Sequence, residues 1–288
     1  MFYLINKHKW LTSFWVLHLL RKKLGIKKIG HTWTLDPLAT GLLLVATGNS
    51  TKLIPYLEKK TKTYIFAFNI DGVSPTWDLE WEVCYFDSKI VESKKGEITK
   101  DAIEEIIKNK FSWKISQIPP KYSAIKIDWK KACDLIRKGK EFEMKKREIE
   151  IFDSELISYE FPEIKIEMTV SAGAYVRTIA EDIWKELWLW WYITLLHRNK
   201  IWDITENLSQ ELDATEDCHS ISEDFLFPEF KKVDVNEDEL ADLKLWREIS
   251  RSWLIEWNKY FASHNGKNES LVEARDSRLI IVRNWLHG

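Results

Sequence analysis

One carboxylate stands apart near the start of the chain. Asp36 is the only acidic residue among the first 57 residues, which also contain eight Lys and Arg residues. Positive neighbours favour the ionised form of a carboxyl group, and an ionised, positioned carboxylate can act by covalent or proton-transfer chemistry. The alternative is structural, because an aspartate before a proline, here Pro37, is commonly a turn cap. The residues around Asp36 must decide between these two interpretations.

The segment around Asp36 is predicted to be an ordered loop. Residues 30–41 read Gly-His-Thr-Trp-Thr-Leu-Asp-Pro-Leu-Ala-Thr-Gly and are rich in turn formers. Before them, apolar residues at helical spacing predict a helix from the N-cap Ser13 to a stop at Gly25. After them, the apolar run 42–45 and the alternating segment 64–70 predict strands, the second half-buried. The carboxylate is therefore expected on a loop between a basic-ended helix and a sheet.

The rest of the chain mixes helices with strands. Helical spacing predicts helices at 101–111, 130–138 and 178–187, and strands are expected at 148–152, 155–160 and 164–170. This mixture is typical of an α+β fold. Residues 203–242 contain fourteen Asp and Glu against two Lys and predict an acidic surface connection. Short strand-like pieces after residue 229 indicate a small β-rich domain.

Charge and composition narrow the class of protein. Without its acidic segment the chain is net basic, which favours a polyanionic partner such as nucleic acid, although a solvated basic face is the alternative. No apolar run approaches the about 18 residues of a membrane span, and no signal peptide is evident, so we expect a cytoplasmic protein without membrane contact. The three cysteines lie far apart, which predicts neither a disulfide framework nor a metal site.

The glycine and tryptophan contents are unusual. The chain has 10 Gly and 16 Trp among 288 residues, whereas glycine is ordinarily about 7% of a protein. Trp129 lies in a turn-like Asp-Trp-Lys-Lys segment, and Trp188, Trp190 and Trp191 crowd one interhelical connection. Turns favour glycine because a positive φ is strained for residues with a Cβ. We hypothesise that the gene reads UGA as glycine; the alternative is a genuine tryptophan-rich binding surface.

Several motifs share their order with one family. Residues 30–41 resemble the catalytic loop of TruB-type pseudouridine synthases, in which glycine replaces Trp33. The resemblance covers about residues 5–202, with His8 and Trp10 departing from the family's Lys-Pro-x-Gly-x-Thr-Ser segment. The other matching blocks are Gly48-Asn-Ser-Thr-Lys52, Lys62-Thr-Tyr64, Thr76-Trp-Asp78, Gln117-Ile-Pro-Pro-Lys-Tyr-Ser-Ala124, Gly173-Ala-Tyr-Val-Arg-Thr178 and Leu195-Leu196-His-Arg198. The family typically carries glycine at the positions of Trp10, Trp33, Trp77, Trp81, Trp113, Trp129, Trp184, Trp188 and Trp202.

The resemblance implies three catalytic residues. Asp36 would act at the ribose of a flipped-out uridine while the base is released, rotated and rejoined through C5. Arg177 would hold the carboxylate, because a guanidinium can orient it as a lysine cannot. Tyr64 would stack on the base and is a candidate to move a proton. Stacking offsets part of the cost of extruding a nucleotide.

The resemblance also implies substrate contacts. Tyr175 would line the same pocket as Tyr64. His31 would contact RNA where the flipped base departs. Lys52 and Leu196 would complete the pocket, Lys52 by positioning the substrate and Leu196 as a wall contact.

The resemblance further implies the architecture and the function. The expected fold is a mixed, mainly antiparallel sheet flanked by helices, in a catalytic domain at 1–212. An acidic connection at 213–228 and a PUA-like RNA-binding domain at 229–288 would follow. The expected activity is conversion of uridine 55 in the tRNA T loop to pseudouridine by a monomer that binds the T-arm, without metal or organic cofactor. The alternatives are a catalytically inactive tRNA-binding module and a dyskerin-like guide-RNA enzyme.

Overall fold

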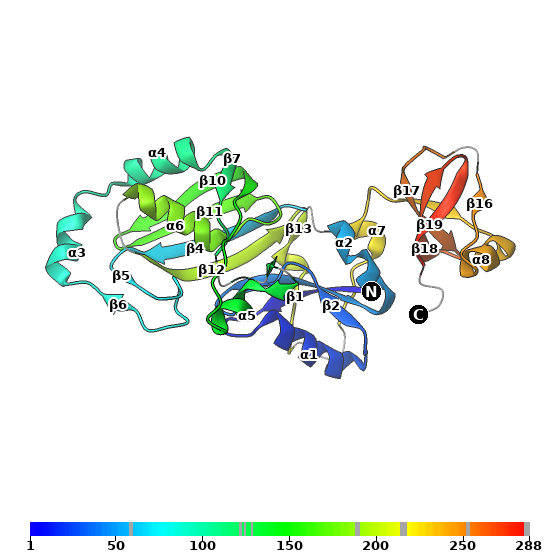
Figure 1. Cartoon of the computed structure of the whole chain (residues 1–288), viewed down its shortest axis with the longest axis horizontal. Helices are drawn as coiled ribbons and strands as arrows, with labels where there is room; N and C mark the ends of the chain where they lie inside the picture. Colours follow the sequence, from blue (N-terminus) through cyan, green and yellow to red (C-terminus); the bar gives the residue numbers. More distant parts are fainter. Residues whose placement is uncertain are drawn as a thin grey trace.

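A computed structural model describes residues 1–57, 60–120, 123, 125–127, 129–187, 191–213, 218–251 and 254–284. Within them, ten strands form one large sheet and five strands form a separate sheet near the C-terminus (Figure 1). The main path of the large sheet runs β14-β1-β3-β12-β4-β11-β10-β7, with β13 beside β12 and β2 beside β3. Its pairs are antiparallel except β1 with β14 and β3 with β12. The predicted α+β fold with a mixed, mainly antiparallel sheet is confirmed.

The strands of the large sheet are β1 Phe2–Lys7, β2 Ile29–His31, β3 Thr40–Thr47, β4 Lys62–Asn69, β7 Trp113–Gln117, β10 Arg147–Glu160, β11 Glu163–Val170, β12 Tyr192–Ile201, β13 Ile204–Thr205 and β14 Gln210–Glu211. The second sheet contains β15 Lys231–Asp234, β16 Ile249–Ser250, β17 Lys259–His264, β18 Lys267–Arg275 and β19 Arg278–Asn284. Two small hairpins pair β5 Gly72–Val73 with β6 Cys84–Tyr85, and β8 Lys126–Ile127 with β9 Lys130–Lys131. The helices are α1 Ser13–Leu24, η1 Gly48–Leu53, α2 Ile54–Leu57, α3 Ser88–Lys95, α4 Lys100–Lys110, α5 Ala132–Arg137, α6 Val176–Leu187, η2 Glu206–Leu208, α7 Glu223–Leu226 and α8 Glu237–Lys244.

The main hydrophobic core lies where α1, α4 and α6 pack on the large sheet. The alternation predicted for residues 64–70 is confirmed, because Phe66, Phe68 and Ile70 are buried in this core and Tyr64 packs at its edge. Burial of each such side chain contributes about 1.5–3 kcal/mol to folding. The core therefore fixes β4, the strand that carries Tyr64, in the middle of the sheet.

The cap of the first helix lies one residue before its predicted position. The hydroxyl of Thr12, not Ser13, accepts the capping hydrogen bond, from the backbone N–H of Trp15 at 3.0 Å. Ser13 is the first helical residue and is 1% exposed. Gly25, with φ of 65°, ends the helix as predicted. Spacing alone could not separate two adjacent hydroxyl residues, each able to cap a helix.

Other predicted elements need adjustment. The two strands expected at 148–152 and 155–160 are one strand, β10, with register shifts after Ile151 and Leu156. The helix expected at 130–138 begins only at Ala132, after the short strand β9. The expected helices at 101–111 and 178–187 correspond to α4 and α6. Trp188 and Trp190 lie outside the described residues.

Residues 203–242, predicted as an acidic surface connection into a second unit, contain more regular structure than the prediction gave them. The described residues of this segment include β13, β14, α7, β15 and most of α8. Phe227, just after α7, is fully buried between Phe2 of β1 and Phe261 of β17, with ring centroids 6.1 and 6.0 Å apart. These aromatic contacts join the large sheet to the C-terminal sheet. The segment therefore combines acidic residues with buried apolar residues such as Ile204, Phe227 and Val233, although Leu208 and Phe225 stay exposed.

No helix among the described residues combines the length and apolar character that a membrane span requires.

Candidate active site

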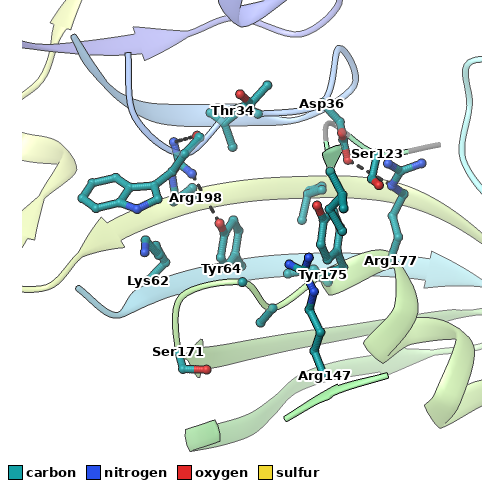
Figure 2. Close-up of a pocket in the computed structure, with 17 residues that line it drawn as sticks. Thr34, Asp36, Lys62, Tyr64, Ser123, Arg147, Ser171, Tyr175, Arg177 and Arg198 are labelled. Carbon is teal, nitrogen blue, oxygen red and sulfur yellow. Dashed lines mark hydrogen bonds and ion pairs between the residues drawn. The ribbon is translucent and has the colours of Figure 1, made fainter. Parts of the chain in front are cut away.

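A cavity of about 300 Å³ opens on the helical side of the large sheet (Figure 2). The loop after β2, strands β4, β10 and β12, and the start of α6 all contribute to its wall. The residues that line it are Trp33, Thr34, Leu35, Asp36, Lys62, Tyr64, Ser123, Ile125, Arg147, Ser171, Gly173, Ala174, Tyr175, Val176, Arg177, Leu196 and Arg198. Five predicted site residues, Asp36, Tyr64, Tyr175, Arg177 and Leu196, thus meet at one cavity.

Asp36 and Arg177 form an ion pair on the wall of this cavity. Arg177 Nε lies 3.0 Å from Asp36 Oδ2. The Arg177 side chain is 9% exposed and that of Asp36 is 35% exposed. A buried guanidinium orients the carboxylate, and the carboxylate still faces the cavity (Figure 2). This arrangement would present the Asp36 carboxylate to a ligand in the cavity with a fixed orientation.

The loop that carries Asp36 is hydrogen-bonded to Ser13, the first residue of α1, and to Trp10 in the segment before this helix. Ser13 Oγ donates to the Leu35 carbonyl at 3.0 Å and accepts from the Leu35 N–H at 2.9 Å. The Trp10 N–H donates to the Pro37 carbonyl at 2.7 Å. These bonds flank Asp36 on both sides and explain why the upstream motif accompanies the loop at residues 30–41.

Lys7 supports the same loop from a buried position. Its side chain is 0% exposed, and Nζ donates to the carbonyls of His8, Leu11 and Pro37 at 3.1, 2.6 and 3.2 Å. Burial lowers the pKa of Lys7 to about 8, against the opposing attraction of Asp36. The hydrogen bond to the Pro37 carbonyl, on the loop that carries Asp36, therefore comes from a buried lysine whose charge can change with pH.

The shifted pKa of Lys7 predicts a pH-dependent stability. The unfolded chain, in which the pKa is 10.5, binds more protons than the folded chain between about pH 8 and about pH 10, so the contribution of Lys7 to stability rises with pH there. The free energy of unfolding of the native chain minus that of Lys7→Met should increase by up to about 1.4 kcal/mol per pH unit. Urea denaturation measures this difference, with Lys9→Met, an exposed lysine, as the control. Parallel pH curves for the native chain and Lys7→Met would contradict the assignment.

The two tyrosines of the site come from different elements. Tyr64 projects from β4, and Tyr175 precedes α6 (Figure 2). The Gln117 side chain holds Tyr175 by its backbone, donating to the carbonyl at 3.0 Å and accepting from the N–H at 2.8 Å. Burial raises the pKa of Tyr175. Gln117 was recognised as part of a motif, but its clamping role depends on a contact across 58 residues.

His31 and Lys52 do not line the cavity. His31 ends β2, and its Nε2 lies 3.0 Å from Thr34 Oγ1. Lys52, in η1, donates to the Asn284 carbonyl of β19. The expectation that Lys52 completes the pocket is therefore wrong, because η1 faces the C-terminal sheet. Burial first, and then the charges of Lys28 and Arg283, lower the pKa of Lys52.

Three cationic residues of the cavity wall were not predicted as site residues. Lys62 begins β4, and its ammonium lies 4.1 Å from the ring centroid of Trp33. Arg147 begins β10, and Arg198 lies in β12 two residues after Leu196. The signal for Arg198 was its place in the Leu195–Arg198 motif. Among the described residues, no three His, Cys, Asp or Glu side chains gather closely enough to hold a metal ion.

Many tryptophans occupy backbone conformations that favour glycine. Trp33, beside the candidate carboxylate, has a φ of 55°. Seven further described tryptophans have positive φ values between 51° and 70°: Trp10, Trp77, Trp113, Trp129, Trp202, Trp246 and Trp257. A left-handed conformation costs an L-residue roughly 1–2 kcal/mol. The backbone at these positions is the one expected for glycine.

Comparison with known proteins places the chain in a family. Residues 21–176 match the family described as TruB family pseudouridylate synthase (N terminal domain). The chain belongs to the TruB family. It is 43% identical over 197 residues to a Fusobacterium nucleatum protein named tRNA pseudouridine synthase B, an alignment that covers 68% of this chain and 66% of the relative. A Phocaeicola vulgatus protein of the same name is 39% identical over 228 residues, covering 77% of this chain and 88% of the relative.

Solved structures extend the similarity of this TruB-family chain to its whole length. The structure of an H/ACA RNP bound to a substrate RNA containing 2′-deoxyuridine superposes with a TM-score of 0.68 at 15% identity, covering 99% of this chain and 84% of the other. A Cbf5-Nop10-Gar1 complex gives 0.68 at 17% identity, covering 98% and 83%. These similarities establish the pseudouridine synthase fold together with the β-rich C-terminal sheet.

Proposed function

We propose that this TruB-family chain is an isomerase that converts uridine 55 in the T loop of tRNA to pseudouridine. Relatives named tRNA pseudouridine synthase B support tRNA as the substrate. The observation that carries the proposal is the ion pair between Asp36 and Arg177 on the wall of the cavity. A turn-capping aspartate would not need a buried guanidinium or an open face toward a cavity.

The reaction requires three events at one nucleotide. The bond between N1 and C1′ breaks, the uracil turns, and a bond forms between C5 and C1′. N1 gains a proton and C5 loses one, so atoms and charge balance without a cofactor. Asp36 acts at the ribose, either by bonding to carbon or by moving a proton. Arg177 keeps the carboxylate oriented while these events occur.

The cavity walls suit an extruded pyrimidine. A base in an RNA loop must leave its stack to enter a protein cavity, which costs a few kcal/mol. Tyr64 and Tyr175 supply aromatic surfaces, and stacking on an aromatic ring is worth about 1–3 kcal/mol per base. Leu196 completes the apolar wall. Tyr64 is also the candidate base that removes the C5 proton.

The finer assignments belong to the same proposal. The C-terminal sheet, with its preceding residues from 229, acts as a PUA-like RNA-binding domain after an acidic connection at 213–228. Lys52, Lys28 and Arg283 interact electrostatically beside this sheet and would attract RNA phosphates. His31 contacts RNA at the edge of the loop. The protein acts as a monomer in the cytoplasm on the T-arm.

Release of tritium from a T-arm transcript made with 5-tritiated uridine tests the proposed function. The native chain should release one tritium per transcript, because only the converted uridine loses its C5 hydrogen. A transcript with cytidine at the target position should release none. Binding without release would favour the inactive tRNA-binding module, and release that requires copurified proteins and a guide RNA would favour the guide-RNA enzyme.

A further inference from the structure

Arg198 is a fully buried cation at the base of the cavity. Its side chain is 0% exposed and is among the largest that the fold buries completely. Among the described residues it forms no ion pair, and its three hydrogen-bond acceptors are neutral. Burying a charge without a counter-ion costs free energy. The three acceptors must therefore explain why the charge lies there.

These acceptors belong to three separate parts of the site. Nη2 donates to the Trp33 carbonyl at 2.9 Å, on the loop that carries Asp36. Nε donates to the Leu42 carbonyl at 2.8 Å, on β3, where that loop ends. Nη1 donates to the Tyr64 hydroxyl at 3.3 Å, on β4 (Figure 2). One rigid guanidinium therefore connects both ends of the loop to the tyrosine.

The backbone of Arg198 packs against the same loop. Residue 198 is paired with Tyr64 on one side and with Gly41 on the other. A Cβ added to Gly41 would lie 2.3 Å from the Arg198 carbonyl oxygen, and Gly41 has a φ of 95°. Only glycine permits this close approach. Main chain and side chain of Arg198 thus fix the loop from two directions.

We propose that Arg198 is a positioning residue that sets the Tyr64 hydroxyl and the Asp36 loop relative to each other. The inference rests on the proposed function, since it assigns Tyr64 and Asp36 to one nucleotide. Because the Tyr64 hydroxyl accepts a hydrogen bond from Arg198, its oxygen is held in a fixed position on the cavity wall. Because Arg198 also holds the Trp33 carbonyl, the loop that carries Asp36, three residues later, keeps its position relative to Tyr64.

Arg198→Lys tests this role while keeping the charge. A lysine has one nitrogen and cannot reach three acceptors in a plane, so kcat for tritium release should fall by about 10²-fold with little change in KM. Arg21→Lys, at an exposed arginine in the last turn of α1 that does not line the cavity, is the matched control and should keep native kinetics. Native kinetics for Arg198→Lys, or a rise in KM alone, would overturn the proposal.

A double-mutant cycle with Tyr64→Phe separates positioning from general stability. If Arg198 acts through the tyrosine hydroxyl, the loss of kcat in the double variant is smaller than the product of the two single losses. Losses that multiply would assign Arg198 a purely structural role. Thermal unfolding of each variant checks that the comparison is made on folded protein.

A spectroscopic measurement keeps the inference independent of activity. In chains labelled with ¹³Cζ-tyrosine, the signal assigned to Tyr64 by its loss in Tyr64→Phe should shift in Arg198→Lys and not in Arg21→Lys. Should Arg198→Lys fail to fold, the guanidinium signals of Arg198 in the folded Tyr64→Phe variant should shift instead. Unshifted signals would overturn the proposal even if the native chain is inactive, and an inactive native chain with the expected shifts would refute the proposed function alone.

Discussion

Replacing Asp36 with asparagine is expected to reduce pseudouridine formation by at least about 10⁴-fold, the scale of loss when an essential catalytic group is removed. Asparagine keeps the shape of the side chain but has neither the negative charge nor a basic oxygen. It can therefore neither bond to the ribose carbon nor move a proton there. Tritium release from the T-arm transcript measures the loss.

RNA binding should respond differently from chemistry. The asparagine side chain of Asp36→Asn would occupy the same space on the cavity wall, so the Kd for the T-arm should change by less than about tenfold, which corresponds to about 1.4 kcal/mol. Asp101→Asn, an exposed aspartate of α4, is the control and should keep native activity. If Asp36→Asn retained more than about one hundredth of the native kcat, the carboxylate would not be the reacting group.

The sequence predicted structure correctly where the pattern was local, and it predicted site residues where several motifs occurred in the order of a known family. The alternation around Tyr64 predicted the buried face of β4, and the motif order identified Asp36 and Arg177 as partners although 141 positions separate them. Their meeting depends on α6 being packed over β4, which no local pattern reports. The family resemblance supplied this pairing in place of a physical derivation.

The incorrect assignment of Lys52 and the failure to predict Arg198 as a site residue have the same physical cause. Lys52 was assigned to the pocket, but the direction of η1 toward β19 follows from the packing of two sheets. Arg198 was passed over because its importance lies in the Trp33, Leu42 and Tyr64 contacts, made across more than 130 positions. Such contacts depend on sheet order, which residue spacing does not encode. The aromatic residues buried after α7 were likewise hidden by an acidic segment.

The tryptophans lead to the second large expected effect. Trp113, Trp129 and Trp246 have φ values of 70°, 68° and 60°, are 78%, 91% and 59% exposed, and make no cation–π contact among the described residues. Glycine at such a position relieves roughly 1–2 kcal/mol of backbone strain, against about 0.5–1 kcal/mol of added chain entropy in the unfolded state. Each Trp→Gly change should therefore stabilise the fold by about 0.5–1 kcal/mol, and the triple variant by about 1.5–3 kcal/mol.

Urea denaturation of the triple variant measures this gain, and Trp15 provides the matched control. Trp15 is 49% exposed but lies inside α1, where glycine is unfavourable, so Trp15→Gly should destabilise the chain by up to about 1 kcal/mol. Opposite signs would follow from the backbone conformations, and Trp15→Gly also removes the stacking of Trp15 on His18. Loss of stability at all four positions would remove the physical support for glycine there.

The hypothesis that UGA is read as glycine makes the same positions decisive in the native host. Peptides of the host protein that span Trp33 and Trp129 should carry the mass of glycine at both positions. At Trp33 the change also matters for the site, because the indole lies against Lys62 and lines the cavity. Trp33→Gly should widen the cavity beside Asp36 and remove the indole from the Lys62 ammonium, which still donates to the Lys60 carbonyl. The KM for the T-arm should therefore fall relative to the tryptophan form. Tryptophan masses in host peptides, together with an unchanged KM, would assign the indoles to the working protein and leave their left-handed backbones as strain that the rest of the fold must offset.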